Sequence, residues 1–121
     1  MGKNHVIGSP TRTVTINGRD YELELGNFSL ALEAQHWAKS LEGLKEAPDA
    51  YEALEPIAEA GRAVVASALG DEAAEELVGG RHRLDIVRML DLLGALVEEI
   101  SSDGYAAELD EALGRFADVA E

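Results

Sequence analysis

The sequence predicts an α+β fold, mainly α, in which an N-terminal β-hairpin packs on about four to five helices. Two observations support this class: apolar residues alternate on both sides of Asn17-Gly18, and apolar residues then recur at helical spacing down to the C-terminus. The chain has 121 residues, 46% of them hydrophobic, which suits one domain with its own core. We expect a flexible lead over 1–10 and a single domain over 11–121, with the hairpin at 12–25 and the helical array at 28–120.

The hairpin is the clearest local signal. Asn17-Gly18 tolerates the positive φ angles of a type I′ turn, and a two-residue turn places Ile16 opposite Arg19. In that register the apolar residues share one face and the threonines and acids share the other. The apolar face comprises Val14, Ile16, Tyr21, Leu23 and Leu25. Because the turn chemistry and the alternation agree, they predict a single register.

Helical spacing begins after Gly26. Asn27 or Ser29 can cap a first helix that runs to about Ala47. Its apolar stripe comprises Leu30, Ala34, Trp37, Leu41 and Leu44. A second helix begins after Pro48-Asp49 and ends near Leu69. Within it, Pro56 either kinks the helix or marks the point where the helix begins.

Three further helices are expected. A short one begins with Asp71 as its cap, ends at Val78 and is closed by Gly79-Gly80. The next runs from about Leu84 to Ser101 and is the most apolar, so we expect it at the centre of the core. Its stripe of 4-3-4-3 spacing comprises Ile86, Leu90, Leu93, Val97 and Ile100. An amphipathic helix over about 105–120 completes the chain.

Charge and composition exclude several functions. The formal net charge is −14, which repels phosphate backbones and anionic membrane surfaces, so neither nucleic acid nor membrane is an expected partner. The chain has no cysteine, which rules out a disulfide framework, a zinc–thiolate site and a thiol nucleophile. The polar first ten residues lack the apolar stretch of a signal peptide, and we expect a cytoplasmic protein.

No residue pattern predicts catalysis, a cofactor or a metal. The three histidines, His5, His36 and His82, are far apart in sequence, and Glu33 with His36 forms only one of the two Glu-x-x-His pairs that a di-iron bundle needs. Residues 81–83, Arg-His-Arg, can attract an anion but follow no phosphate-binding loop. A serine nucleophile elbow and a calcium-binding loop are both missing. We therefore expect no catalytic, cofactor-binding or metal residues, and the protein is not expected to be an enzyme.

Two stretches resemble a known family. They are TVTINGRDYELELGN (13–27) and ALGDEAAEELVGGRHRLDIVRMLDLLGALVEEI (68–100). Together they resemble the small tail assembly chaperones of long-tailed phages and prophages, whose relatives carry a segment of the form FGEGxAxxIFGG before an apolar helix. Gly70, Ala74, Gly79 and Gly80 match that form, Asp71 and Leu77 replace it conservatively, and Leu69, Glu72 and Val78 depart from it. The last helix lies outside the matched stretches.

The resemblance implies a non-enzymatic function in a bacterial host cell. Such chaperones coat the tape measure protein before the tail tube forms, so the implied partners are that protein and further copies of the chain. The candidate structural or partner-binding residues are Asn17, Gly18, Gly79, Gly80, Leu90, Leu93, Val97 and Ile100. Two alternatives remain: an acidic regulatory module, like an antitoxin or a nucleic-acid mimic, and a minor structural protein of a phage.

Overall fold

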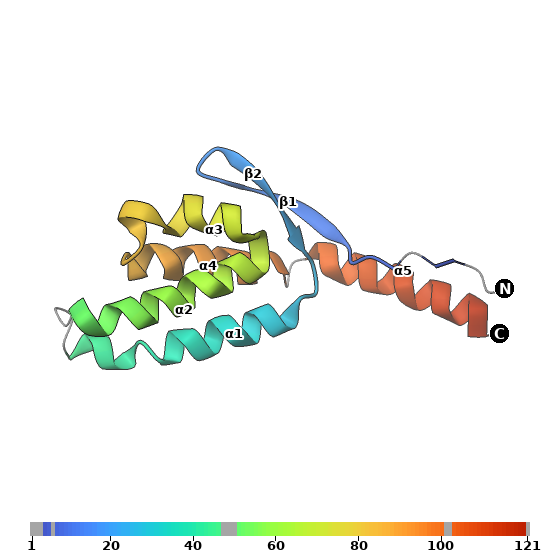
Figure 1. The fold of residues 1–121 in the computed structure, drawn as a ribbon. Coiled ribbons are helices and arrows are strands. Elements are labelled where there is room, and N and C mark those ends of the chain that lie inside the picture. Colours follow the sequence, from blue (N-terminus) through green and yellow to red (C-terminus); the bar gives the residue numbers. More distant parts are fainter. Residues whose placement is uncertain (1–3, 6, 47–50, 101–102, 121) are drawn as a thin grey trace.

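The computed structural model describes residues 4, 5, 7–46, 51–100 and 103–120. Within them an antiparallel hairpin precedes a set of helices, so the predicted α+β, mainly α class is confirmed. The elements are β1 (Thr11–Ile16), β2 (Arg19–Glu24), α1 (Phe28–Lys39), η1 (Glu42–Lys45), α2 (Tyr51–Leu69), α3 (Asp71–Val78), η2 (Gly80–His82), α4 (Ile86–Ile100) and α5 (Asp103–Ala120). Helices α1 to α4 pack side by side beneath the hairpin, and α5 projects from one end of this group (Figure 1).

The hairpin has the predicted register and turn. Ile16 pairs with Arg19, and Asn17 and Gly18 have φ angles of 52° and 82°, as a type I′ turn requires. Val14, Leu23 and Leu25 are buried, while Ile16 and Tyr21 pack at the edge of the core. The predicted apolar face therefore lies against the helices.

The first helix is shorter than predicted. Asn27 caps α1 by accepting a hydrogen bond from the Leu30 backbone N at 3.4 Å, and α1 ends at Lys39 instead of near Ala47. The Ser40 hydroxyl donates to the Trp37 carbonyl at 2.6 Å, a side-chain bond that competes with continued helix. The chain continues as the 3-10 turn η1. Ala47 and the predicted start at Pro48-Asp49 lie outside the described residues.

Helix α2 runs through Pro56, so the proline does not mark its start. One turn further on, Gly61 faces the indole of Trp37, whose Nε1 donates to the Ile57 carbonyl at 2.8 Å. A Cβ on Gly61 would lie 2.5 Å from Trp37 Cζ2. The missing side chain is what lets α1 and α2 approach this closely.

The cap of α3 differs from the prediction. Gly70, with φ of 96°, is the N-cap, and Asp71 is the first helical residue. A positive φ turns the chain directly from α2 into α3, so Asp71 contributes its charge to the first turn and not its side-chain oxygen to a cap. Gly79 and Gly80 follow the last residue of α3, as predicted, with Gly80 at φ of 55°.

Helix α4 lies at the centre of the core, as its composition predicts. Met89, Leu96 and Ile100 are almost wholly buried, and α4 packs on α1, α2 and β2. The hairpin is held over this core by ion pairs at both ends of its apolar face. Arg12 pairs with Glu99 of α4 at 3.3 Å, and Arg19 pairs with Glu76 of α3.

Helix α5 begins at a single aromatic contact. The rings of Tyr105 and Phe28 meet edge to face with centroids 5.2 Å apart, and Tyr105 lies over Gly26. Beyond that contact, every residue from 106 to 119 is exposed. No helix in the described part of the chain is both long and apolar enough to cross a lipid bilayer.

Candidate partner-binding groove

Large apolar side chains reach the surface at two opposite ends of the molecule. One group lies at the first turns of α4, where Val87 is 67% and Leu90 39% exposed. The other lies along α5, at the far end of the molecule in Figure 1. Further exposed apolar side chains in the described residues are Ile7, Phe28, Leu32 and Tyr51. Contiguous apolar surface of this kind marks protein-binding sites more often than isolated residues do.

The surface at the start of α4 is hollowed into a groove of about 510 Å³. Seven of its eight lining residues are apolar. They are Leu41, Leu44, Leu54, Leu84, Ile86, Val87 and Leu90, and Asp85 is the eighth. We call this feature the apolar groove.

The turn that follows α1 and the N-terminal ends of α2 and α4 form the apolar groove. Because α1 stops at Lys39, the chain turns through η1 and brings Leu41 and Leu44 to the end of α2 and α4. Leu54 comes from the second turn of α2, and Leu84 lies two residues before the start of α4.

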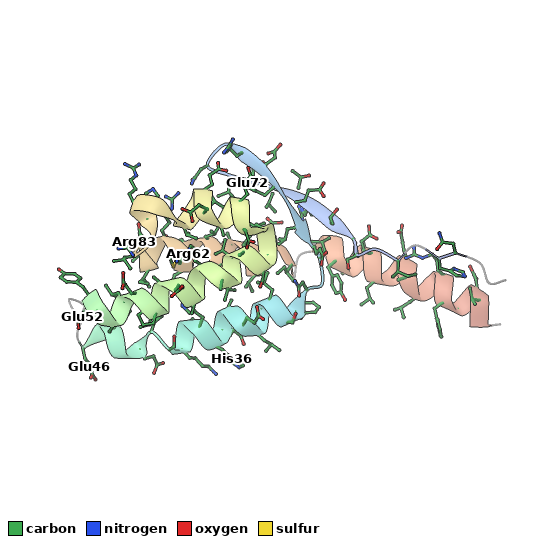
Figure 2. The ribbon with its side chains drawn as sticks, in the orientation of Figure 1. His36, Glu46, Glu52, Arg62, Glu72 and Arg83 are labelled. Carbon is green, nitrogen blue, oxygen red and sulfur yellow. The ribbon has the colours of Figure 1, made fainter. Side chains whose placement is uncertain are left out.

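Charges of both signs stand beside the apolar groove. Arg83 Nη1 donates to Glu55 at 2.9 Å, and these residues are next in sequence to Leu84 and Leu54 of the lining. Arg83 projects at this end of the molecule in Figure 2, and Arg81 precedes it in η2.

The predicted apolar stripe of α4 divides between the core and the groove. Leu93 and Ile100 are buried at 3% and 0%, so these two candidate structural or partner-binding residues lie in the core. Val97 is half-buried and packs against the core, whereas Leu90 opens into the apolar groove. Periodicity identifies an apolar stripe, but it does not show how far neighbouring elements cover that stripe.

The glycines among the predicted residues have backbone functions. Asn17 and Gly18 form the hairpin turn, and Gly80 adopts a positive φ after α3. A Cβ on Gly79 would lie 2.5 Å from the Glu75 carbonyl oxygen. These residues shape the fold, and Asn17 also lines a pocket.

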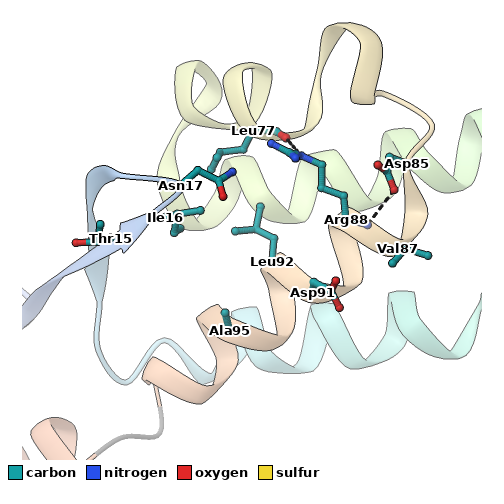
Figure 3. A pocket seen from close by; sticks show the side chains of 10 residues that line it. All are labelled: Thr15, Ile16, Asn17, Leu77, Asp85, Val87, Arg88, Asp91, Leu92 and Ala95. Carbon is teal, nitrogen blue, oxygen red and sulfur yellow. Dashed lines mark hydrogen bonds between the residues drawn. The ribbon is translucent and has the colours of Figure 1, made fainter.

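That pocket is polar, has a volume of about 530 Å³ and lies between the hairpin turn, α3 and α4 (Figure 3). Two of its three charged side chains make hydrogen bonds to the helix backbone. Arg88 Nε donates to the Leu77 carbonyl at 2.5 Å, at the end of α3, and Asp85 Oδ1 accepts from the Arg88 backbone N at 3.0 Å. On the hairpin side, the Thr15 hydroxyl donates to Asp20 at 2.7 Å. Three polar side chains of the lining, Thr15, Asp85 and Arg88, thus make hydrogen bonds within the fold.

The other candidate polar residues are spread over the surface. His36 is exposed on α1, far from Glu72 of α3 in Figure 2. The Arg81 Nε donates to the neighbouring His82 Nε2 at 3.3 Å. Within the described residues, no three histidine or acidic side chains lie close enough together to hold a metal ion. Glu99, at the acidic end of α4, is paired with Arg12.

Sequence reasoning missed most of the apolar groove. Val87 and Leu90 lie on the side of α4 away from its most buried residues. The sequence does indicate this surface, because α4 has apolar residues around more than half of its circumference, more than one buried face needs. Leu54 carries no such signal, because it is one apolar residue on an amphipathic helix.

Comparisons with protein-family models, curated proteins and solved structures found no match for this chain.

Proposed function

We propose that this chain is a non-enzymatic tail assembly chaperone that holds an amphipathic helix of a tape measure protein in the apolar groove. The observation that carries the proposal is the groove itself, with seven apolar lining residues open at the surface. The identity of the partner comes from the resemblance of residues 13–27 and 68–100 to that family. On this proposal, the protein is encoded by the phage or prophage whose tail it helps to assemble.

Groove shape favours a helical occupant. Helices bind grooves through apolar side chains spaced three, four and seven residues apart, which enter a hydrophobic channel between the receptor's helices. The apolar groove is lined by side chains from the turn that follows α1 and from the N-terminal ends of α2 and α4. Exposed Val87 and Leu90 would be covered when a partner helix enters, and this burial is the main favourable term.

The acidic surface suits the same function. A long helical partner with basic flanks would be attracted by a chain of net charge −14, which accelerates encounter and disfavours wrong partners. Glu42 follows Leu41 at the start of η1, and Glu52 lies two residues before Leu54 in α2, so the segments that line the groove also carry carboxylates.

The test is binding of tape measure fragments to groove variants. Leu90→Glu places a charge in the apolar groove, and we expect the dissociation constant to rise at least about tenfold, or about 1.4 kcal/mol. Titration calorimetry with purified full-length chain measures this change. Ala95→Glu is the matched control, since it adds the same charge on α4 outside the groove. Equal binding by the Leu90→Glu and Ala95→Glu variants would contradict the proposal.

A further inference from the structure

Helix α5 is an amphipathic helix without a partner in the described chain. Its apolar side chains recur at spacings of four and three residues, and their exposure rises away from the Tyr105–Phe28 contact. Leu109 is 45% exposed, Leu113 59%, Phe116 71% and Val119 84%. This is the pattern that a groove-binding helix presents to its receptor.

The same chain carries a receptor of matching kind at its other end. We propose that α5 of one copy lies in the apolar groove of a second copy, so that chains join head to tail. The two surfaces are different patches, which makes the contact heterologous. This inference goes beyond the proposed function, and it does not depend on the tape measure protein, because the occupant is the same chain.

A copy does not fill its own groove in this structure. The groove lies at the N-terminal end of α4 and α5 follows its C-terminal end, and from Ile86 to Ile100 the helix rises about 21 Å. Helix α5 then points away from the groove (Figure 1). Leu109 and the residues after it are therefore presented to another molecule.

Charge favours the groove over a second α5 as the receptor. From residue 105 to residue 119, α5 carries the acids Glu108, Asp110, Glu111 and Asp118, with Arg115 as its one base. Two α5 helices side by side would bring these acids together, and like charges repel. At the groove they meet charges of both signs, because Arg81 and Arg83 stand near Asp85 and near Glu55, to which Arg83 is already bonded. Repulsion is therefore weaker at the groove than between two α5 helices, and burial of the apolar stripe is the main favourable term.

A contact made by one helix is small. Complexes that bury less than about 1,200 Å² are weak and transient, so we expect association to increase with concentration up to about 1 mM. Because the donor and receptor lie at opposite ends, each added chain leaves one free α5 and one free groove. The association should therefore extend beyond dimers.

Complementary variants of the full-length chain test this arrangement. Leu113→Glu with Phe116→Glu impairs α5 and leaves the groove intact, whereas Val87→Glu with Leu90→Glu impairs the groove and leaves α5 intact. We expect each variant alone to sediment as a monomer of 12.9 kDa. An equimolar mixture should form a two-chain complex and nothing larger, since only one productive contact remains. Sedimentation velocity measures all three samples, and circular dichroism verifies the fold of each variant.

Each alternative arrangement gives a different result. Self-association of the groove variant alone would show that α5 pairs with α5, and self-association of the α5 variant alone would show groove pairing with groove; either overturns the inference. Unmodified chain that stays monomeric at about 1 mM overturns it too. Ala107→Glu with Gly114→Glu is the matched control, because both residues lie on the opposite face of α5, and it should associate like the unmodified chain. Tape measure fragments are tested on the unmodified chain beside this mixture. If the fragments fail to bind while the α5 variant and the groove variant still form their two-chain complex, only the proposed function is contradicted.

Discussion

Gly61 shows how one missing side chain sets the distance between two helices. The Trp37 indole lies across it, anchored by the 2.8 Å hydrogen bond to the Ile57 carbonyl one turn earlier in α2. An added Cβ on Gly61 would also lie 3.0 Å from Met89 Sδ, so α4 closes the same site. In an open helix, alanine is more favourable than glycine by about 1 kcal/mol, but here the lack of space reverses that preference.

Gly61→Ala should therefore destabilise the protein. We expect the free energy of unfolding to fall by about 1–3 kcal/mol, because Trp37 or α2 must shift to admit the methyl group. Denaturant titration followed by the fluorescence of Trp37, the single tryptophan, measures the change. Gly94→Ala in α4 serves as the control, since its Cβ meets open space, and it should leave stability unchanged or raise it by up to about 1 kcal/mol. A stable Gly61→Ala variant would mean that α1 and α2 are less closely packed than described.

Tyr21 provides a second test at this scale. Its hydroxyl is buried and lacks a hydrogen-bond partner among the described protein atoms. Because a buried donor without a partner is unfavourable, we expect Tyr21→Phe to keep the packing of the hairpin and to leave the melting temperature equal or higher. Thermal unfolding followed by circular dichroism measures this. A clear loss of stability would show that the hydroxyl has a partner after all.

Elements differ in how firmly the rest of the chain holds them. The hairpin has a buried face and ion pairs to α3 and α4, although exposed pairs of this kind contribute at most about 1 kcal/mol each. Helix α5 has one aromatic contact at its first turns and no buried side chain from 106 to 119. Tyr105 lies over Gly26, whose positive φ and lack of a side chain both permit the contact. The attachment of α5 thus depends on a small number of atoms.

Hydrogen exchange should separate α5 from the core. In dilute protein we expect the amides of 107–119 to exchange at least about 100-fold faster than those of 92–100 in α4, because α5 can open without disturbing the core. Exchange detected by nuclear magnetic resonance at about 20 μM measures this, below the range in which we expect association. Raising the concentration should then slow exchange in α5. Equal protection of the two helices in dilute protein would contradict this description of α5.

At the scale of the whole molecule, net charge and apolar surface make different predictions for a partner. A net charge of −14 acts over long range and is screened by salt, whereas an apolar groove acts through contact and is not. An acidic regulatory module would depend on the first property. The proposed chaperone depends on the second.

Salt titration distinguishes the two. We expect the affinity for a tape measure fragment to fall less than about tenfold between about 0.05 M and about 0.5 M salt, since burial in the apolar groove dominates binding. Fluorescence anisotropy of a labelled fragment measures the affinity. A control titration with a basic peptide that lacks an apolar stripe should lose its binding over the same range. Steep salt dependence of the fragment itself would favour the acidic regulatory module.

Local features were predictable because the residues that decide them are close in sequence. The hairpin register follows from Asn17-Gly18 and the alternation beside it, and the structure reproduces it pair for pair. Helix boundaries were less accurate. Ser40 ends α1 and Gly70 caps α3 through competition between nearby hydrogen-bonding groups and backbone angles, which apolar periodicity does not report.

The sequence by itself determined the fold class, the hairpin register, the central position of α4 and the acidic character of the chain. Tertiary structure alone decided which apolar residues stay open: Leu93 and Ile100 are sealed in the core, Val87 and Leu90 line a groove, and the stripe of α5 faces outward. The physical reason is that an apolar pattern records a preference for leaving water, which a core, a groove or another molecule satisfies equally well. Which of the three applies depends on what the rest of the chain places beside each side chain.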